Sequence, residues 1–535
     1  MKKLSITIFL CSVTLCLIAK PAYRGPIART SADGIEHIVY LHGNEHFHYM
    51  TDADGQWLDE TTLQPLSEEK KDEKLKLRAD MAAICRAPQQ TEAVGDQPYP
   101  APRGLLILVN FADLSFTTPV ATIDSMLNGQ DFSRSYTFVQ NGRRRHITSS
   151  GSARKYFQDQ SYGQYNPVFD VVGPVTLNNN ASYYGSNNSQ GNDQHAGQMV
   201  NEACQLADAE FNVDFTQYDN DGDGFVDFVY IIYAGYGEAD GGGDSTIWPH
   251  QSYTYYQVDN KYVSRYACGN ELSYSSKKYD GIGTFCHEFS HVLGLPDLYI
   301  VGNGTHKTLG QWDIMDYGPY NNDGNTPPAY SAYERFYMGW LTPRALTAAE
   351  TVELSPINEN EGESLLLSSR THNLVGWNPN PTEFYLLEVR KREGWDAYIP
   401  GDGMLITRIK YSRSKWQNNS VNATAGSMGV DILEADGSAP AYSDDPDMYD
   451  PGYFGKAGDA FPAGATEWTA FAGHEITNIQ LLTNGAVLFD YLGGSPQSIM
   501  PAATGNSAAR VLCNGQILII RNGITYDLNG RITAL

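Results

Sequence analysis

Residues 284–297 carry the pattern that most constrains how this chain can fold, His-Glu-x-x-His-x-x-Gly-x-x-Asp. Side chains four residues apart lie on one face of an α-helix, so the spacing predicts a helix that presents His287 and His291 to one metal ion, with Glu288 beside them. Imidazole nitrogens are ordinary zinc ligands. The alternative interpretation is a buried amphipathic helix in which both histidines are hydrogen-bonded core residues.

The residues after the second histidine predict where this helix ends. Gly294 can adopt the left-handed conformation that closes a helix, and Pro296 prevents its continuation. The chain then turns back, and Asp297 is expected to supply a third zinc ligand through a carboxylate oxygen. Three protein ligands leave one tetrahedral position for a water molecule, whose pKa zinc lowers toward neutrality. Glu288 is the predicted general base, which takes the proton of this water as it attacks a peptide carbonyl.

A glycine-bounded turn at residues 310–318 follows the predicted ligands. Met315 lies in this turn as the methionine of a metzincin Met-turn does, and it is expected to pack beneath the zinc ion. The hydroxyl of Tyr317 is predicted to reach the oxyanion that develops when water adds to the carbonyl. Under the alternative interpretation, both residues only pack beneath the helix.

These features resemble the immune inhibitor A family of secreted metalloproteases. The resemblance rests on the extended zinc motif, the methionine turn and the segment Ser-Ala-Tyr-Glu-Arg-Phe-Tyr-Met-Gly-Trp-Leu at residues 331–341. It implies an α+β, zincin or metzincin-like catalytic domain and a propeptide that holds the protease latent until export. The family also carries a β-module after the protease, and short apolar runs separated by glycine, proline and asparagine predict an all-β sandwich-like domain here.

A chain of 535 residues is too long for a single core, so several domains are expected. Strand-like and turn-like residues at 35–55 predict a β-rich propeptide, and a proline-containing segment at 97–104 predicts its end. Residues 493–506 have the composition of a linker, and the tail beyond them resembles C-terminal sorting tails. The predicted segments are a signal peptide (1–19), the propeptide (20–100), the zinc metalloprotease catalytic domain (101–343), the β-sandwich-like domain (344–495), and the linker with the sorting-like tail (496–535).

The N-terminal residues predict export. Two lysines precede an apolar run that ends at Ala19, which is the anatomy of a secretory signal peptide. The mature protein is therefore expected to be secreted or held at the cell surface, and no run of residues is long enough to predict a transmembrane segment. Lipidation at Cys16 is the less favoured alternative, because Leu15 is not the small residue that such processing needs. The net charge of −25 argues against nucleic acid as a partner.

Residues 219–227 predict a calcium site. Asp219, Asp221, Asp223 and Asp227 occupy loop positions one, three, five and nine, with glycine at position six. This spacing wraps oxygen ligands around Ca²⁺. Tyr230 stands where an EF-hand has its bidentate glutamate, and a strand follows instead of a helix, so we expect a calcium turn that stabilises a sheet. A plain aspartate-rich turn is the alternative.

Three smaller expectations concern cysteines and basic residues. Cys85, or His46 with His48, could cap the zinc ion in a latent precursor. Residues 143–145, three consecutive arginines, are interpreted as a solvated loop, and Cys286 as a packing or disulfide residue. Five cysteines remain after the predicted signal peptide, so at least one is unpaired or intermolecular: Cys85, Cys204, Cys268, Cys286 and Cys513.

Together these patterns predict a secreted zinc-dependent endopeptidase, made as a zymogen, that hydrolyses peptide bonds of extracellular proteins. Its expected partners are protein or peptide substrates and its own propeptide, which acts as an inhibitor. The alternative is an exported calcium-dependent adhesin or binding protein on an inactive protease fold. The intact Glu288 favours the enzyme, and the same zinc ion could also serve hydrolysis of a non-peptide amide.

Overall fold

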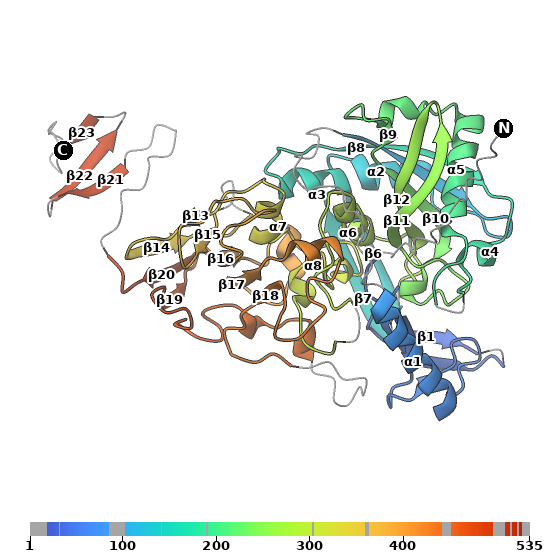
Figure 1. The fold of residues 1–535 in the computed structure, drawn as a ribbon, viewed down its shortest axis with the longest axis horizontal. Helices are drawn as coiled ribbons and strands as arrows, with labels where there is room; N and C mark the ends of the chain where they lie inside the picture. Colours follow the sequence, from blue (N-terminus) through green and yellow to red (C-terminus); the bar gives the residue numbers. More distant parts are fainter. Residues whose placement is uncertain are drawn as a thin grey trace, which may run out of the picture.

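The computed structural model describes residues 19–84, 102–440 and 451–495, apart from short gaps at 32, 46, 141, 189–190, 302–303 and 359–362, together with three strands between 509 and 526. Over these residues the protein is mixed α/β, with many sheets and few helices (Figure 1). Residues 1–18 of the predicted signal peptide and residues 97–101 of the segment predicted to end the propeptide lie outside the described residues. Within the described part, no helix combines the length and the apolar character needed to cross a membrane.

A six-stranded sheet forms the centre of the region that carries the motif, with the strand order β11-β12-β10-β5-β8 and β9 paired to β12. Neighbouring strands run parallel, except that β11 is antiparallel to β12. Strands β5 and β10 are buried on both faces along most of their length, which explains their continuous apolar runs. The strands are β5 (Arg103–Asn110), β8 (Val168–Thr176), β9 (Phe225–Val226), β10 (Val229–Tyr236), β11 (His250–Val258) and β12 (Lys261–Leu272).

Strand β5 shows how the sheet divides the core into two. Successive side chains point to opposite faces of a strand. Leu106 and Leu108 belong to one apolar cluster, and Leu105, Ile107 and Val109 belong to the other. Helix α5 (Ala196–Phe211) contributes to the second cluster, with α4 (Ala181–Gly185) beside it. The helices that contribute to the first cluster include α2 (Val120–Asn128), α3 (Ala153–Gln160) and α6 (Ile282–Val292).

Residues 143–145 correct one expectation, because the three arginines lie in a strand and not in a loop. β6 (Ser133–Gln140) and β7 (Arg143–Ser150) form a two-stranded antiparallel hairpin. All three arginine side chains are exposed. A hairpin with a solvated face tolerates charged side chains while its backbone hydrogen bonds are made across the ladder. Charge composition alone therefore misjudged this segment.

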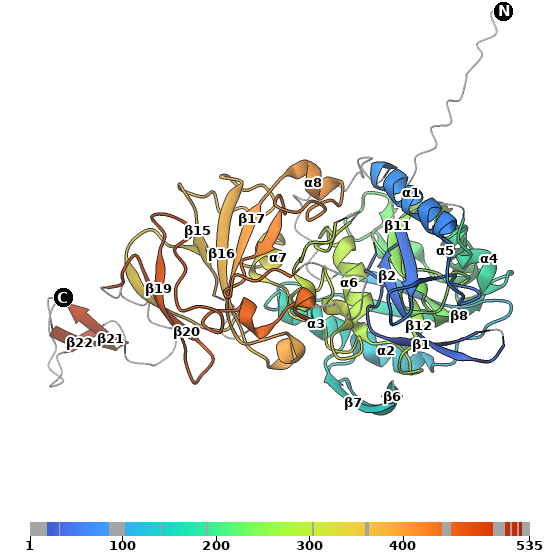
Figure 2. The same ribbon diagram turned by 90° about the horizontal axis from the view of Figure 1, so that it is seen from below.

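The pro-region forms a small module of its own, an antiparallel sheet with the strands in chain order, followed by α1. In both views the module, coloured blue, lies against the central region and away from the C-terminal sheets (Figures 1 and 2). Its apolar side chains share one cluster with Ala239 and Trp248. The elements are β1 (Ile27–Thr30), β2 (Glu36–Asn44), β3 (Phe47–Thr51), β4 (Trp57–Leu58) and α1 (Glu68–Ile84).

Residues 344–495 contain a five-stranded sheet, β13-β15-β16-β17-β18, and a three-stranded sheet, β14-β20-β19. In β17, Leu405 and Ile409 belong to the large cluster that includes α6, whereas Met404 and Ile406 belong to a cluster shared with the three-stranded sheet. The five-stranded sheet is therefore covered on both faces. The strands are β13 (Arg344–Ala345), β14 (Glu350–Leu354), β15 (Leu365–Leu367), β16 (Glu383–Arg390), β17 (Gly403–Lys410), β18 (Val430–Ile432), β19 (Ile476–Leu481) and β20 (Val487–Tyr491).

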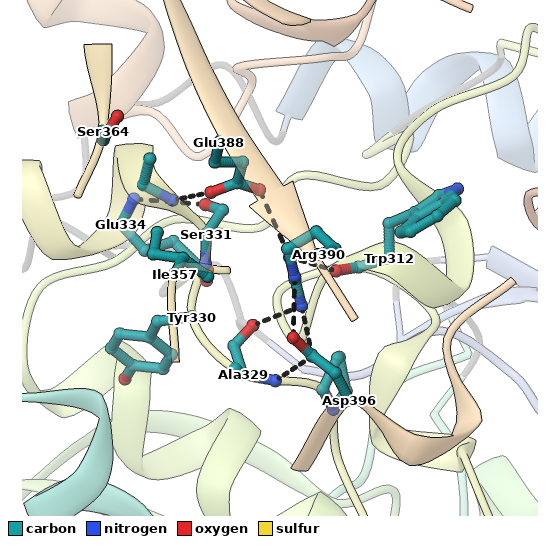
Figure 3. Close-up of polar contacts among 12 residues, drawn as sticks. Trp312, Ala329, Tyr330, Ser331, Glu334, Ile357, Ser364, Glu388, Arg390 and Asp396 are labelled. Atoms are coloured by element: carbon teal, nitrogen blue, oxygen red, sulfur yellow. Dashed lines mark hydrogen bonds and ion pairs between the residues drawn. The ribbon is translucent and has the colours of Figure 1, made fainter. Parts of the chain in front are cut away.

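A buried arginine joins this region to the residues just before it. The guanidinium of Arg390 donates to Asp396 at 2.9 Å, to the Ala329 carbonyl at 3.1 Å and to the Trp312 carbonyl at 3.3 Å (Figure 3). Glu388 lies 3.3 Å from the same guanidinium. Since the arginine is fully buried, its charge depends on these partners. Two short helices flank the junction, α7 (Ala332–Tyr337) and α8 (Arg413–Gln417), and the tail contains β21 (Ala509–Cys513), β22 (Gln516–Arg521) and β23 (Ile524–Tyr526).

Candidate metal centre

Helix α6 places the motif inside the protein. Every residue from 282 to 291 is buried. Phe285 and Phe289 pack edge-on against Phe169 of the central sheet, which fixes the rotation of the helix about its axis. The helix ends as the sequence predicts, since Gly294 has φ +99° and donates its N–H to the His291 carbonyl at 2.9 Å. This left-handed residue turns the chain back toward the histidine face.

The structure brings His287, His291 and Asp297 together. The two Nε2 atoms are 3.2 Å apart, and Oδ1 of Asp297 lies 3.4 Å from Nε2 of His287 and 3.1 Å from Nε2 of His291. Ligands placed about 2.0–2.1 Å from one tetrahedral zinc ion would be separated by about 3.3 Å. The three donor atoms therefore have the mutual spacing of ligands that share one ion.

A second layer of hydrogen bonds orients these donors. Nδ1 of His287 contacts the Ile314 carbonyl at 2.7 Å, and Nδ1 of His291 contacts the Leu295 carbonyl at 2.7 Å. A carbonyl accepts only from an N–H, so both rings carry the proton on Nδ1 and direct the Nε2 lone pair at the shared point. Asp297 receives a side-chain hydrogen bond on Oδ2 and is left with Oδ1 directed at the two histidines.

The charges at this centre favour the binding of a cation. Asp297 is fully buried, and among the described residues its Oδ1 has no hydrogen-bond partner. Burial lowers the pKa of His287. Burial also opposes the charged form of His291, but the Asp297 and Glu288 carboxylates raise its pKa to about 9. Without a metal ion, the negative charge of Asp297 is balanced by a proton on His291. A divalent cation can replace this proton, so the three donors fit a zinc ion.

Glu288 lies beside the three donors, as predicted. One of its carboxylate oxygens lies within 4.8 Å of a ring nitrogen of each histidine. Oε1 accepts a hydrogen bond from the backbone N–H of Lys20 at 3.1 Å, and Oε2 has no hydrogen-bond partner in the described part of the chain. Burial raises the pKa of this carboxyl well above its usual value. A buried, basic carboxylate with one open oxygen is suited to accept a proton.

The glycine-bounded turn at 310–318 packs under α6. Met315 is fully buried in the same apolar cluster as the helix, and its carbonyl accepts a hydrogen bond from the Leu298 N–H at 2.8 Å. The hydroxyl of Tyr317 faces the cleft, where it accepts a hydrogen bond from the Arg24 N–H at 2.8 Å. The turn therefore lies where the sequence expects it, with the tyrosine hydroxyl on the cleft side.

Residues of the predicted propeptide run through the cleft. A cavity of about 650 Å³ is lined by this segment and by residues of the catalytic region. Ala19 and Lys20 are buried. The Trp248 indole donates to the Lys20 carbonyl at 3.1 Å, and the Tyr320 hydroxyl donates to the Pro21 carbonyl at 2.6 Å. Hydrogen bonds from several elements thus hold the segment in one extended course past Glu288.

One contributor to the centre escaped the sequence analysis. Asn419, which follows α8, donates from Nδ2 to Oδ2 of Asp297 at 2.6 Å and accepts from the Asp297 backbone N–H at 2.7 Å. It is buried and separated from Asp297 by 122 residues. Its own φ of +49° is in the left-handed region, which asparagine tolerates. No local pattern around Asn419 points to a metal ligand.

The aspartate-rich turn is only partly as expected. Carboxylate oxygens of Asp219, Asp221 and Asp223 lie within 4.8 Å of one another. Asp227 is not in this group, and its Oδ2 instead accepts hydrogen bonds from the backbone and side chain of Asn220 at 2.6 and 2.8 Å. Asp219 is also paired with an amine, Lys261. Three of the four predicted calcium ligands therefore converge.

Of the three residues expected to cap the zinc ion in a latent precursor, the structure describes His48. His48 lies against Glu238, with 3.1 Å between Nε2 and Oε1, and not at the metal centre. His46 and Cys85 lie outside the described residues. Among the described cysteines there is no disulfide: Cys204, Cys268 and Cys286 are free and buried. Cys286 is thus a packing residue, since it faces the apolar cluster around α6.

Comparison with known proteins agrees with the resemblance. Residues 95–341 match the family model described as immune inhibitor A peptidase M6, catalytic domain. The chain is 27% identical to the pre-pro-metalloprotease PrtV of Vibrio cholerae serotype O1 over 217 residues, 35% of this chain and 23% of that protein. It is 26% identical to immune inhibitor A of Bacillus thuringiensis subsp. alesti over 270 residues, 44% of this chain and 39% of that protein. The chain thus spans well under half the length of these relatives.

Proposed function

We infer that the protein is a zinc-dependent endopeptidase of extracellular proteins. Residues 95–341 resemble immune inhibitor A metallopeptidases, so this stretch is a hydrolase. The observation that carries this inference is the convergence of His287, His291 and Asp297 at 3.1–3.4 Å beside a free carboxylate oxygen. The relatives are named as proteases, and no observation favours the adhesin alternative. Secretion and synthesis as a zymogen belong to the same proposal.

The chain's own residues divide the work of hydrolysis. When bound, a zinc ion supplies Lewis acidity to the attacking water and to the scissile carbonyl. Glu288 accepts the proton of the water on Oε2 and delivers it to the nitrogen that leaves. Its position supports the second step, because Oε1 already contacts a backbone nitrogen, that of Lys20. We propose that Tyr317, whose hydroxyl faces the cleft, donates to the developing oxyanion.

We propose that the pro-region is the inhibitor of this site. The segment that follows Ala19 lies along the cleft and lines its cavity, and its Lys20 N–H donates to Oε1 of the proposed base, Glu288. A substrate needs the same space, so the two exclude each other. The pro-module holds the segment in place by its apolar contact with Ala239 and Trp248. Activation then requires cleavage of the chain and release of the module.

A calcium ion in the turn formed by Asp219, Asp221 and Asp223 is a further part of the proposal. The convergence of three carboxylates supports it, since oxygen ligands in a short loop suit Ca²⁺. The ion would tie the turn to the start of β10 and stabilise the sheet. Thermal unfolding in calcium and in chelator tests this, with an expected difference of several degrees that disappears in Asp221→Asn. Equal unfolding temperatures in both solutions would exclude a structural calcium ion.

Casein digestion tests the mechanism. The full-length chain is expressed, allowed to mature and loaded with zinc, and digestion is compared with that by Glu288→Gln and by a chelator-treated sample. We expect Glu288→Gln to lose at least about 10³-fold in kcat while retaining its zinc. Asp244→Asn, in an acidic loop near the cleft, is the matched control and should digest normally. Wild-type digestion by Glu288→Gln would refute the assigned base.

A further inference from the structure

The ammonium of Lys20 lies in a closed acidic pocket. Nζ donates to both carboxylate oxygens of Asp240, at 2.9 and 3.1 Å, and to Oγ1 of Thr284 at 2.9 Å. The side chain of Lys20 is 2% exposed and that of Asp240 is 11% exposed. All three hydrogen atoms of the ammonium therefore have an acceptor, and water has little access to the pair.

The pocket belongs wholly to the catalytic region. Thr284 lies in the first turn of α6, and its hydroxyl donates to Oδ2 of Asp280 at 3.1 Å. Asp240 closes the opposite side from a one-turn 3-10 helix at Glu238–Asp240. The ring of Tyr320 lies 4.8 Å from Nζ of Lys20, a cation–π distance. Asp240, Thr284, Asp280 and Tyr320 therefore all belong to the part of the chain that stays with the enzyme when the pro-region leaves.

Departure of Lys20 leaves the pocket without a cation. The carboxylates of Asp240 and Asp280 then lack the ammonium, and the aromatic face of Tyr320 also favours a cation. A buried carboxylate without a partner is strongly disfavoured. An incoming lysine or arginine side chain restores the ion pair, whereas an apolar or acidic side chain cannot. The pocket therefore discriminates in favour of basic side chains.

The backbone of Lys20 shows which substrate residue the pocket would receive. Its nitrogen is 3.1 Å from Oε1 of Glu288, the group that must protonate the leaving nitrogen when a peptide bond is cut. A residue whose nitrogen lies there is the first residue after the scissile bond. The side chain of that residue is the one directed between Asp240 and Thr284.

We propose that Asp240 is the specificity-determining residue of this peptidase, and that its preferred substrates carry lysine, or secondarily arginine, immediately after the cleaved bond. The inference rests on the proposed function. The pro-segment then inhibits by presenting the side chain that the enzyme recognises in substrates. Asp280 and Thr284 support the pocket by holding the negative charge and the third acceptor in place.

The first test maps cleavage sites. The full-length chain is expressed, allowed to mature, loaded with zinc and incubated with a peptide library made from a cell proteome. Mass spectrometry of the fragments should show lysine and arginine enriched about tenfold or more directly after the cut bonds. Cleavage with no such enrichment would overturn the proposal. Failure to cleave any peptide would instead refute the proposed endopeptidase function, so the two failures are distinguishable.

The second test changes the charge of the pocket. Asp240→Asn preserves shape and should reduce kcat/KM for a peptide with lysine after the cut bond by about 100-fold, with little change for the matched alanine peptide. Asp240→Lys should shift the preference toward glutamate. Asp244→Asn controls for a general loss of negative charge. An unchanged lysine preference in Asp240→Asn would overturn the assignment.

The third test needs no variant protein and so does not depend on folding. The pentapeptide Lys-Pro-Ala-Tyr-Arg, the sequence of residues 20–24, is compared as an inhibitor with the same peptide carrying norleucine in place of lysine. Norleucine keeps the aliphatic stem and removes the ammonium. We expect the inhibition constant of the norleucine peptide to be at least about 30-fold higher than that of the lysine peptide. Equal inhibition by the two peptides would contradict an acidic pocket.

Discussion

The pro-module and the C-terminal sheets both reach the metal centre, but they are attached in different ways. The pro-module meets the catalytic region through one small apolar cluster and through polar contacts, which include those of an extended segment and the His48–Glu238 pair. The C-terminal five-stranded sheet shares the large apolar cluster that contains α6. Under the proposed function, the first region must separate from the active site, whereas the second is part of its core.

The difference is clearest in what each region offers the catalytic residues. The pro-segment donates the N–H of Lys20 to Oε1 of Glu288, the proposed general base. The C-terminal region supports Asp297 through both polar groups of the Asn419 amide. A blocking contact must be reversible, and a supporting contact must persist during turnover. The comparison teaches that closeness to an active site does not by itself identify an accessory domain.

Removing the buried guanidinium should test this attachment most severely. Arg390→Met leaves the carboxylates of Glu388 and Asp396 without their buried partner, so we expect the free energy of unfolding to fall by about 3–5 kcal/mol. Thermal unfolding followed by calorimetry measures the loss. Because the two regions share one core, a single transition should move to lower temperature.

The control for this change is Arg408→Met on the neighbouring strand β17. Arg408 pairs with Asp431 at 2.6 Å, but its side chain is 25% exposed. Its removal should cost about 1 kcal/mol or less. If Arg390→Met unfolded only residues 344–495 and left the catalytic region folded, the idea of a shared core would be wrong.

Asn419→Ala tests support of the metal ligand. The substitution removes the hydrogen bond to Oδ2 of Asp297, so the carboxylate loses its fixed orientation. We expect zinc affinity to fall by about 10–100-fold, measured by competition with a chromogenic chelator. Asn418→Ala, one residue earlier, is the control and should bind zinc normally. Unchanged affinity in Asn419→Ala would mean that Asp297 is positioned by the fold alone.

The weakest predicted effect concerns pH and the docking of the pro-module. Burial opposes protonation of His48, but Glu238 raises the pKa of the ring to about 9. Glu60 strengthens this effect, and Lys74 weakens it. A histidine whose pKa is raised on docking stabilises the docked state fully below its free pKa of about 6.5, and this stabilisation is lost as the pH rises through about 9. The pro-module should therefore bind less tightly in alkaline solution.

Residual activity of the unprocessed precursor measures this loss of docking. We expect it to increase by up to about tenfold between pH 7 and pH 9.5. His48→Gln should already be elevated at pH 7 and should lack this increase. His146→Gln, which alters an exposed histidine on β7, is the control. An identical pH profile in His48→Gln would show that another group governs docking.

The features that could be predicted from the sequence are those set by the spacing of residues that lie close together in the chain. The helix around His287, its end at Gly294 and the return of Asp297 depend on residues within a few turns of one another. Asn419 and Asp240 could not be found in this way, because they reach the site through tertiary contacts across 122 and 220 residues, to Asp297 and Lys20 respectively.

Charge and spacing are both weaker guides where backbone hydrogen bonds decide the conformation. The three arginines at 143–145 were placed in a loop, although backbone pairing puts them in a strand. Asp227 fits the ligand spacing of a calcium loop, yet it is bonded to Asn220. In both cases hydrogen bonds of the backbone decided the conformation, and the composition of the side chains could not reveal which bonds would form.

The side-chain amide of Asn419, which is hydrogen-bonded to Asp297, sets a lower limit on the length of an active enzyme. The stretch that defines the peptidase family stops at residue 341, nearly eighty positions short of Asn419. A fragment trimmed at that border would retain both histidines and the glutamate but would expose the underside of α6 and leave the third ligand unsupported. Laboratory truncation, or natural loss of the downstream strands, should therefore abolish activity although every proposed metal ligand is still present.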